Sequence, residues 1–362
     1  MTIPNEEAQS VRRALTGWYM ANRRSLPWRK TCDPYHIWVS EIMLQQTQVN
    51  TVIAYYERFI RAFPDIRTLA EADLQGVLKL WEGLGYYSRA RNFHAAAKTV
   101  MVLHDGRVPG KWDAFIDLPG VGDYIASAVQ SIAFGKPVAV VDGNVKRVLA
   151  RIFEISAPAN QSSSYKIFKS IACDLLDRND PGTFNQAVME LGALVCKPAR
   201  PLCSECPVSP WCLAFAGGRP ADFPVKIKKL PVPHHHLAVG VVFKQEKLLI
   251  VRRPETGMLG GLWEFPGGRI GPDEPAERAC VRILKESTGV GTTVRAHLTR
   301  IRHAYTHFKI TADVFICDWA SGRVRLSGPT GHRWVTPEEL PLYPMPKSNH
   351  KFMNQLMEAV QQ

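Results

Sequence analysis

Two carboxylates stand out because each interrupts a run of apolar residues. Glu41 lies within IWVSEIML (Ile37–Leu44), where six of the eight residues are apolar. Burial disfavours the ionised form of a carboxyl and raises its pKa, so Glu41 could hold a proton near neutral pH. Asp142 ends the apolar run 138–141 and precedes a basic amphipathic pattern. One protonated and one ionised carboxyl are the pair that breaks glycosidic bonds.

Both carboxylates also have purely structural explanations. Glu41 could lie in the first turn of a helix, where the helix dipole favours a negative charge. Asp142 stands before a helical pattern, and aspartate is a preferred N-cap residue. The sequence alone does not show whether the two side chains meet, so the paired-acid interpretation needs support from other motifs.

Four cysteines are crowded into one short segment. Cys196, Cys203, Cys206 and Cys212 follow the spacing C-x6-C-x2-C-x5-C. Four thiolates in one loop can bind a single iron–sulfur cluster or a zinc ion. Zinc loops more often use two C-x2-C pairs and only one is present, so the spacing favours the cluster and leaves zinc as the rival. We expect the separate cysteines to be packing residues; they are Cys32, Cys173, Cys280 and Cys317.

A glycine pair begins the segment LPGVGDYIASAV (Leu118–Val129), which continues as a helical pattern. Such a turn can direct backbone N–H groups and a helix N-terminus at an anion, and in a basic protein the natural anion is a DNA phosphate. We therefore expect phosphate binding by Leu118, Gly120, Val121 and Gly122. A plain tight turn would have the same sequence.

The overall charge also suggests a polyanionic partner. The 362 residues carry a formal charge of +12, which favours nucleic acid, although a merely soluble basic protein has the same balance. The N-terminus lacks a signal-peptide pattern, and no apolar run is long enough to span a bilayer. We expect a cytoplasmic, DNA-associated monomer.

The periodicity of apolar residues changes along the chain. It is helical from Val11 to about Ala214, and residues 216–236 are rich in proline and lysine, which predicts a linker containing the polar run His234–His236. Strand-like segments follow, namely LAVGVVF, KLLIVRR, ADVFICDW and HRWVTPEEL, with one helical pattern at Glu274–Ser287. We predict a mainly α domain over 1–215, a linker over 216–236, and an α+β domain over 237–362.

The cysteine spacing, the LPGVG hairpin and VDGNVKR together resemble the helix-hairpin-helix DNA glycosylases of the endonuclease III superfamily. Within it, SEIMLQQTQV, GLGYYSRARN and FNQAVMELGALVC resemble the MutY-type adenine DNA glycosylases. The resemblance implies a mainly α domain with a 4Fe-4S cluster loop over 196–212. It also implies base-excision repair of double-stranded DNA, in which adenine mispaired with 8-oxoguanine or guanine is removed after base flipping.

The resemblance also assigns roles to residues. Glu41 would protonate the adenine ring and later help to activate water, and Asp142 would stabilise or trap the oxocarbenium-like sugar. Tyr124 and Asn144 would orient these groups. Relatives that also cut the backbone carry a lysine where this chain has Tyr124, so we expect a monofunctional glycosylase without strong lyase activity. Further substrate-binding residues implied are Trp28, Arg29, Leu44, Gln46, Tyr86 and Gln186.

The C-terminal segment GLWEFPGGRIGPDEPAERACVRILKESTGV resembles the Nudix box. Two of its expected metal-binding carboxylates are replaced, by Ile283 and Ser287, so the resemblance implies a kept fold and a lost pyrophosphatase activity. The family's lesion-recognition loop corresponds to Tyr305-Thr306-His307, where the Thr306 hydroxyl could bond to an oxidised guanine. Alternatively, HAYTH is simply the start of a strand.

Other functions remain compatible with these motifs. The first is an endonuclease III-like glycosylase for damaged pyrimidines, disfavoured by Tyr124 and by the additional domain. The second is a Nudix nucleotide hydrolase with a DNA-binding appendage, disfavoured by Ile283 and Ser287. The third is a non-catalytic DNA-binding protein with a cluster, which would release no product.

Overall fold

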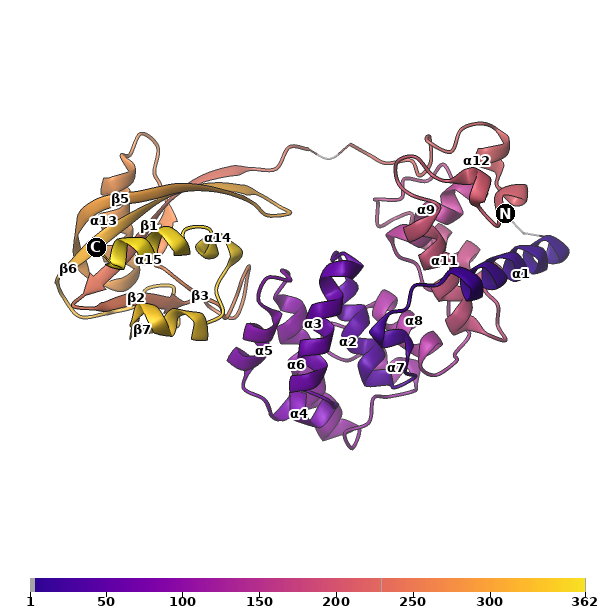
Figure 1. Cartoon of the computed structure of the whole chain (residues 1–362), viewed down its shortest axis with the longest axis horizontal. Helices are drawn as coiled ribbons and strands as arrows, with labels where there is room; N and C mark the ends of the chain where they lie inside the picture. Colours follow the sequence, from indigo (N-terminus) through magenta and orange to yellow (C-terminus); the bar gives the residue numbers. More distant parts are fainter. Residues whose placement is uncertain (1–3, 229, 362) are drawn as a thin grey trace. The chain divides into compact units, whose positions relative to one another are not determined.

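The computed structural model describes residues 4–228 and 230–361, which form two compact units (Figure 1). Unit 1 comprises Met1–Ala70 and Ala95–Lys229, and unit 2 comprises Glu71–His94 and Leu230–Gln362. The helical part of the chain contains α1 (Asn5–Asn22), α2 (Pro34–Leu44), α3 (Val49–Ala62), α4 (Ile66–Glu71), α5 (Leu74–Trp81), α6 (Ser88–Leu103), α7 (Trp112–Ile116), α8 (Asp123–Ile132), α9 (Gly143–Ile152), α10 (Tyr165–Leu175), α11 (Pro181–Leu194) and α12 (Leu213–Ala216).

Three helices of unit 1 begin at aspartate caps. Asp33 accepts hydrogen bonds from the backbone N–H groups of the first turn of α2, Asp142 does the same for α9, and Asp180 for α11. Pro34 and Pro181 follow two of these caps at the first helical position, where the missing N–H has no intrahelical partner to lose. The caps fix where each helix starts, and therefore which side chains of that helix reach the cavity described below.

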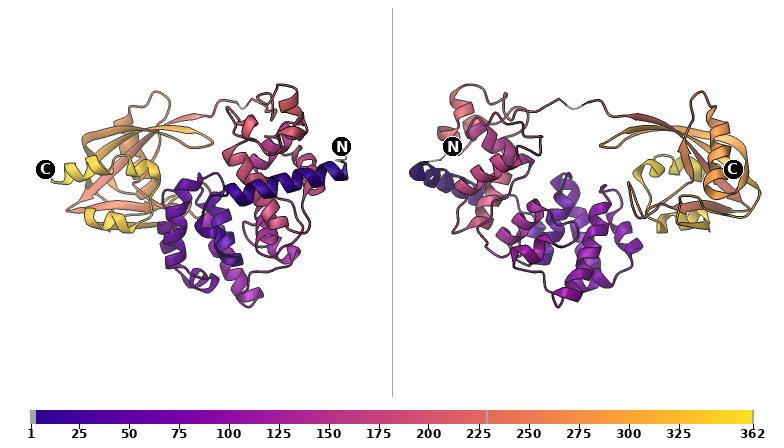
Figure 2. Two further views of the ribbon diagram at one scale, coloured as in Figure 1. Left: turned by 45° about the vertical axis from the view of Figure 1, so that its right-hand side comes forward. Right: turned by 180° about the vertical axis from the view of Figure 1, so that it is seen from behind.

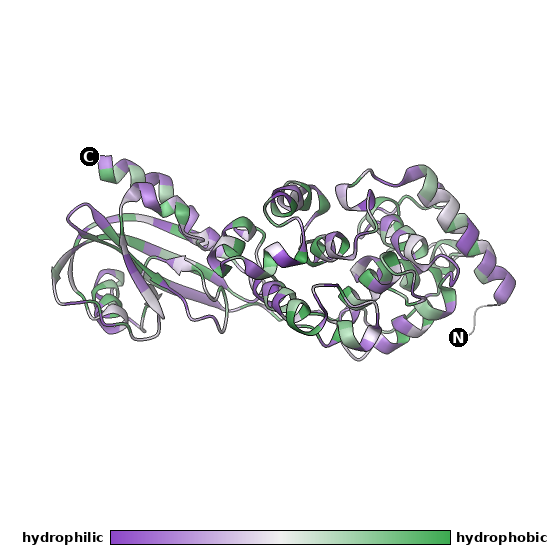
Figure 3. Cartoon of the chain, turned by 90° about the horizontal axis from the view of Figure 1, so that it is seen from below, coloured by the Kyte–Doolittle hydropathy of each residue, from purple (hydrophilic) through white to green (hydrophobic). Residues whose placement is uncertain are grey.

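The N-terminal helix α1 packs against helices that come much later in the chain. Its buried residues are Ala8, Val11, Leu15 and Tyr19, and they share one hydrophobic core with α9, α10 and α11. Hydrophilic residues are interspersed along α1 (Figure 3), and its exposed residues are mostly polar. The Arg12 guanidinium also donates to the backbone carbonyls of Leu175 and Asp174, at 3.0 and 2.9 Å.

The segment between the predicted domains is irregular over most of its length. Helix α12 ends at Ala216, and the described residues 217–228 and 230–233 contain no helix or strand. The predicted linker, 216–236, is wrong at its end, because His234–His236 are the first residues of strand β1 (His234–Lys244). His234 and His236 stack on one face of that strand, since alternate residues of a strand share a face.

Unit 2 is built on a mixed sheet that contains β1, β2 (Lys247–Arg252), β3 (Trp263–Glu264), β4 (Gly267–Arg269), β5 (Gly291–Ala304), β6 (Lys309–Ser321) and β7 (Gly331–Val335). The strand order is β3-β2-β1-β6-β5, with β4 paired to β1 and β7 to β2. Strands β1 and β6 are parallel, with Val239 opposite Val314. Helix α13 (Ala276–Thr288) packs on one face, and the other face is covered by α14 (Lys347–His350) and α15 (Met353–Gln361) (Figure 2).

Unit 2 agrees with most of the predicted elements of the α+β domain. The helix predicted at Glu274–Ser287 is observed as α13, which is capped at its C-terminal end by Gly289 with a φ of 72° that favours glycine. Strand β5 was not predicted, because its alternation of apolar and polar residues is weak. The segment HRWVTPEEL is a strand only to Val335 and then becomes a 3-10 helix over Pro337–Leu342.

The segment 71–94 also belongs to unit 2, although the predicted helical domain, 1–215, contains it. The Gln75 side chain donates to the carbonyl of Gly261 at 3.1 Å and accepts from the Trp263 indole at 2.9 Å. The Glu82 carboxylate accepts from the backbone N–H of Met345 at 2.7 Å. Among the described residues, no helix is both long and apolar enough to cross a membrane.

Candidate active site

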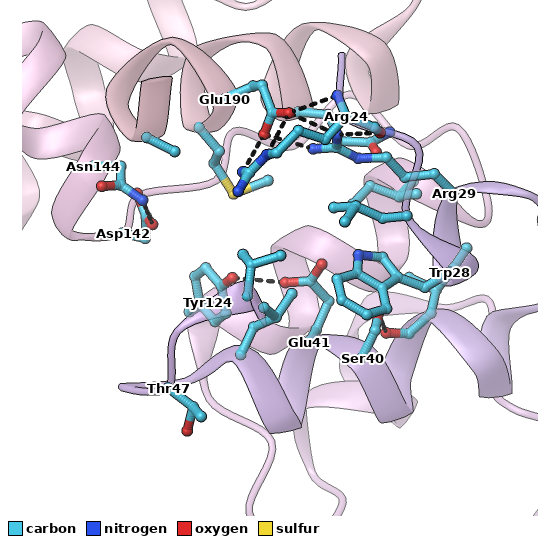
Figure 4. Close-up of a pocket in the computed structure, with 18 residues that line it drawn as sticks. Arg24, Trp28, Arg29, Ser40, Glu41, Thr47, Tyr124, Asp142, Asn144 and Glu190 are labelled. Carbon is cyan, nitrogen blue, oxygen red and sulfur yellow. Dashed lines mark hydrogen bonds and ion pairs between the residues drawn. The ribbon is translucent and has the colours of Figure 1, made fainter. Parts of the chain in front are cut away.

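The two carboxylates singled out in the sequence line one cavity of about 140 Å³ in unit 1 (Figure 4). Glu41 comes from α2 and Asp142 from the cap of α9, so residues 101 positions apart (142 − 41) are brought together. The walls of the cavity also include α11, the start of α8 and the 3-10 helix Pro27–Arg29. Six other predicted site residues line the same cavity, namely Trp28, Arg29, Leu44, Tyr124, Asn144 and Gln186.

Glu41 lies near the end of α2 and is 5% exposed. The first-turn explanation for this residue is therefore wrong, because α2 begins at Pro34. The pKa of Glu41 is raised to about 7, chiefly by burial; the hydrogen bond from Tyr124 and the charge of Arg29 oppose the rise, and the nearby charge of Asp142 adds to it. That bond runs from the Tyr124 hydroxyl to Glu41 Oε2 at 2.6 Å. Glu41 can therefore give or accept a proton near neutral pH.

Asp142 is both a helix cap and a cavity residue. Its Oδ1 accepts from the Val145 backbone N–H at 2.7 Å, and its Oδ2 accepts from Asn144 Nδ2 at 3.2 Å. Arg147 in turn donates to Asn144 Oδ1 at 2.8 Å, which fixes the orientation of the amide. Burial raises the pKa of Asp142, while the bonds from Val145 and Asn144 and the charge of Arg147 lower it.

Opposite Glu41, the cavity wall contains an ion-pair cluster that none of the sequence motifs indicated (Figure 4). Glu190 of α11 is 1% exposed and accepts bonds from Arg24 at 2.9 and 2.6 Å and from Arg29 at 2.9 and 3.0 Å. Burial alone would raise the pKa of Glu190, but the bonds from both arginines outweigh it and lower the pKa to about 2. Arg29 therefore reaches the cavity as part of this ion pair. The available signal was an acidic residue within the apolar AVMELGAL of α11.

Trp28 and Gln186 are fixed in the wall by aromatic and polar contacts. The Trp28 ring meets Tyr56 edge-on, with ring centroids 5.3 Å apart. Gln186 Oε1 accepts from the Tyr19 hydroxyl at 3.1 Å. Gln46 does not line this cavity; it is exposed, has a φ of 58°, and lines an adjoining surface depression of about 530 Å³ together with Asp142.

The other predicted substrate-binding residues belong to unit 2. Tyr86, Tyr305, Thr306 and His307 line a cavity of about 450 Å³, and the Tyr86 and Thr306 hydroxyls are hydrogen-bonded. Strand β5 ends at Ala304 and β6 begins at Lys309. The tripeptide Tyr305-Thr306-His307 is therefore a connecting turn, and the alternative that HAYTH begins a strand is wrong.

The predicted phosphate-binding hairpin connects α7 to α8. The Val121 N–H donates to the Leu118 carbonyl at 3.1 Å, and Gly120 has a φ of 75°, a conformation that favours glycine. Gly122 is the N-cap of α8 and contributes no side chain there. The hairpin thus exposes the backbone immediately before a helix N-terminus, which is a general geometry for binding anions.

The four clustered cysteines follow α11 and are all half-buried free thiols. Arg151 donates to Cys196 Sγ at 3.3 Å, and Cys212 Sγ donates to the Arg151 carbonyl at 3.3 Å. The pKa of Cys206 is raised to about 11, chiefly by burial and in part by the charges of the other three cysteines, so all four are electrostatic neighbours. Within residues 4–228 and 230–361, no group of His, Cys, Asp or Glu is arranged to hold a metal ion.

Comparisons with known proteins agree with both units. Residues 39–172 match the model of the HhH-GPD superfamily of base excision DNA repair proteins, and residues 238–355 match the NUDIX domain model. A thermostable thymine-DNA glycosylase of known structure is 31% identical, with a TM-score of 0.55, over 59% of this chain and 98% of its own. A trapped endonuclease III–DNA complex is 19% identical, with a TM-score of 0.52, over 60% of this chain and 99% of its own.

Full-length relatives give the more specific result. The adenine DNA glycosylase of Mus musculus is 37% identical over 92% of this chain and 75% of its own length. That of Schizosaccharomyces pombe is 32% identical over 85% of this chain and 82% of its own. The predicted fold classes are confirmed: a helix-hairpin-helix glycosylase domain and a Nudix-like α+β domain. The chain belongs to the adenine DNA glycosylases, enzymes that hydrolyse the N-glycosidic bond of adenine in DNA.

Proposed function

We propose that adenine is released in the 140 Å³ cavity by Glu41 and Asp142, and that the substrate is adenine mispaired with 8-oxoguanine or guanine. The observation that carries the proposal is the pair itself: two carboxyls from α2 and α9 line one cavity, and burial raises the pKa of Glu41 to about 7. A leaving purine must be neutralised by a proton, and a sugar cation must be balanced by a nearby anion.

Glu41 supplies the proton. At pH 7 a carboxyl with a pKa of about 7 is protonated in about half of the molecules, so it can donate to a ring nitrogen of adenine. Protonation weakens the bond between the base and the sugar because the departing base no longer carries a negative charge. Once ionised, the same carboxylate can accept a proton from the attacking water.

Asp142 stabilises the sugar cation that forms as the base departs. Its cap bond to Val145 and its bond to Asn144 hold the carboxylate before the reaction, so little reorganisation is needed when charge develops. Across the cavity from Asp142, the Tyr124 hydroxyl holds the Glu41 carboxyl through the hydrogen bond of 2.6 Å. The Glu190 cluster fixes Arg24 and Arg29 in the wall, and Trp28 and Gln186 complete the surface that meets the base.

The enzyme acts on duplex DNA, from which the adenine must be flipped to reach a buried carboxyl. The hairpin Leu118–Gly122 would bind the DNA backbone, and Leu44, Gln46 and Tyr86 would contact the opened stack. In unit 2, the turn Tyr305-Thr306-His307 would recognise the oxidised guanine through the exposed Thr306 hydroxyl. We propose that the enzyme is a monofunctional glycosylase, since Tyr124 replaces the lysine that lyases use. We also propose that it acts as a monomer.

The four cysteines would hold a 4Fe-4S cluster. The donor set suits such a cluster in its chemistry, because the four thiols belong to one loop and are mutual electrostatic neighbours and Arg151 donates to Cys196 Sγ; in the described residues they are not already arranged around a common centre. Such a cluster, when bound, supplies a cross-link that orders the loop and a centre able to transfer one electron. The ordered loop carries Lys197 and Arg200, whose charges suit contact with phosphates. Iron and sulfide analysis of the purified protein distinguishes the cluster from zinc.

The direct test is a single-turnover assay on duplexes that carry adenine opposite 8-oxoguanine, guanine, cytosine or thymine. We expect adenine release from the first two and little from the others. Failure to release adenine opposite 8-oxoguanine, with the cysteine loop loaded, would refute the proposed substrate. Efficient borohydride trapping of an enzyme–DNA crosslink, lost on substituting one lysine, would refute the monofunctional assignment.

A further inference from the structure

An acidic residue lies directly after the hairpin that we propose to bind a DNA phosphate. Asp123 is the first residue of α8 and follows the N-cap Gly122. A carboxylate in the first turn of a helix is favoured by the helix dipole, but a phosphate is attracted to the same N–H groups. Two neighbouring anions repel each other, so Asp123 would weaken DNA binding at the hairpin unless its charge is balanced.

Helix α10 supplies the balancing partners. The Lys169 ammonium donates to Asp123 Oδ2 at 2.7 Å, and the Tyr165 hydroxyl donates to the same oxygen. Tyr165 and Lys169 are four residues apart (169 − 165), so both lie on one face of α10. The side chains of Lys169 and Asp123 are 22% and 39% exposed, so water screens this ion pair only in part.

The Lys169 ammonium is fully used within the described part of unit 1. Besides Asp123, it donates to Ser127 Oγ at 2.8 Å and to the Ala139 carbonyl at 2.7 Å. An ammonium has three N–H donors, and these three acceptors account for all of them. A lysine that binds a phosphate directly needs a free donor, so Lys169 does not serve as a direct phosphate ligand.

We propose that Lys169 is a positioning residue for DNA binding. It neutralises Asp123 and holds the carboxylate against α10, which leaves the N–H groups of the hairpin for one DNA phosphate, and Tyr165 shares this role through its hydroxyl. The inference rests on the proposed phosphate binding by Leu118–Gly122 and adds what makes that binding compatible with an acidic neighbour. Without the ammonium, the carboxylate charge would face the phosphate and compete for the same N–H groups.

A rival role is compatible with the same contacts, and experiment separates the two. Ala139 lies three residues before Asp142 (142 − 139), so the rival role of Lys169 is to position Asp142 for adenine release. A charge role changes the affinity for DNA and depends on salt, because salt screens the repulsion between Asp123 and the phosphate. The rival role changes the rate of adenine release at saturating enzyme and does not depend on salt.

The test is a cycle of charge-removing substitutions in the full-length enzyme. Binding is measured by fluorescence anisotropy on a duplex that carries 8-oxoguanine opposite a 2′-fluoro analogue of deoxyadenosine, which resists release. Lys169→Gln should weaken binding about tenfold at low salt and much less at high salt. Asp123→Asn should bind at least as tightly as the unmodified enzyme, and the double substitution should recover its affinity, because both charges are gone. Lys98→Gln, the same change at an exposed position of α6, should leave binding unchanged.

Two further measurements locate the effect. The rate of adenine release from the ordinary substrate at saturating enzyme should remain normal in Lys169→Gln. Uncharged methylphosphonate is then placed at one backbone position of the duplex at a time. At one position the difference between Lys169→Gln and the unmodified enzyme should disappear, because the repelled charge is absent. Tyr165→Phe should weaken binding in the same salt-dependent manner by about threefold.

Thermal melting shows whether each variant is folded. The proposal is overturned if folded Lys169→Gln binds like the unmodified enzyme, if the double substitution does not recover affinity, if the loss is equal at low and high salt, or if no methylphosphonate position removes it. Slower release at saturating enzyme with unchanged affinity would assign Lys169 to Asp142 instead.

A second pair of variants keeps the test decisive if Lys169→Gln does not fold. Weaker binding by Asp123→Asn than by the unmodified enzyme would then overturn the proposal, whereas equal or tighter binding, with a salt-dependent loss in Tyr165→Phe, would support it. Failure of the unmodified enzyme to release adenine opposite 8-oxoguanine is a separate result, which refutes the proposed function itself.

Discussion

Replacing Glu41 with glutamine removes the proposed proton donor while keeping its shape. An ordinary glutamate with a pKa of 4.5 would be protonated in only about 0.3% of molecules at pH 7, whereas a pKa of about 7 gives about half. Burial therefore raises the population of the acid about 150-fold. General acid–base catalysis contributes about 10²- to 10⁴-fold, so Glu41→Gln should lower the single-turnover rate by at least about 10²-fold.

The assay is adenine release from a duplex with adenine opposite 8-oxoguanine, with enzyme in excess over DNA. DNA binding by Glu41→Gln should be retained, because the glutamine amide can still accept the bond from Tyr124. The rate of the unmodified enzyme should fall as the pH rises through about 7, as Glu41 loses its proton. Glu57→Gln, the same change at an exposed position of α3, is the matched control and should behave normally.

The same substitution has a signature in stability. The pKa of Glu41 is raised on folding, so the folded state retains the proton between pH 4.5 and about 7, and folding becomes less favourable as the pH rises through this range. Glu41→Gln removes this penalty and should increase the free energy of unfolding above pH 7 by up to about 3 kcal/mol. A near-normal single-turnover rate, or no gain in stability at pH 8, would refute the reasoning.

Three further substitutions test other parts of the site. Asp142→Asn keeps the N-cap of α9, so the free energy of unfolding should change by less than about 1 kcal/mol, while the rate of adenine release should fall about 10²-fold or more. Asp180→Asn, the same change at the cap of α11, is the control and should leave the rate of adenine release unchanged. Glu190→Gln should lower the free energy of unfolding by about 3 kcal/mol, because the pKa of Glu190 is lowered to about 2. That contribution is present above pH 4.5 and disappears as the pH falls through 2. The difference in the free energy of unfolding between the unmodified enzyme and Glu190→Gln should therefore be larger at pH 7 than at pH 2. Cys206→Ser should lose iron and visible absorbance, whereas the exposed Cys32→Ser should retain both; equal iron contents would exclude Cys206 as a ligand.

The fold was predictable where short motifs have strong local causes. The spacing of apolar residues predicted helices up to Ala214, and α13 was located within two residues at its start and one at its end. Strand β5 was missed because many of its side chains are exposed, which leaves little apolar alternation to detect. His234–His236 look polar in isolation but form a strand, since pairing with β6 satisfies their backbone groups.

The site was predictable for residues carried by motifs and not for those that depend on tertiary pairing. Glu41 and Asp142 were visible because a charge in an apolar run is unusual. Glu190 pairs with Arg24 and Arg29 across more than 160 positions, and no local pattern indicates which partner a buried charge will find. Gln46 was predicted as a substrate-binding residue from its motif; the structure places it outside the cavity of Glu41, with a left-handed backbone, in the adjoining depression.

The packing of α1 has a consequence for how the enzyme is made. The ribosome delivers α1 well before α11, yet the surface that α1 covers is complete only when α11, 159 residues further on (181 − 22), has emerged. A nascent chain that has just released α2 already carries Glu41 but lacks the wall provided by α9 and α11. Early translation products and chains truncated before α11 should therefore be unable to damage intact DNA, because the acid and its counter-charge are assembled only when both ends of the helical unit have met.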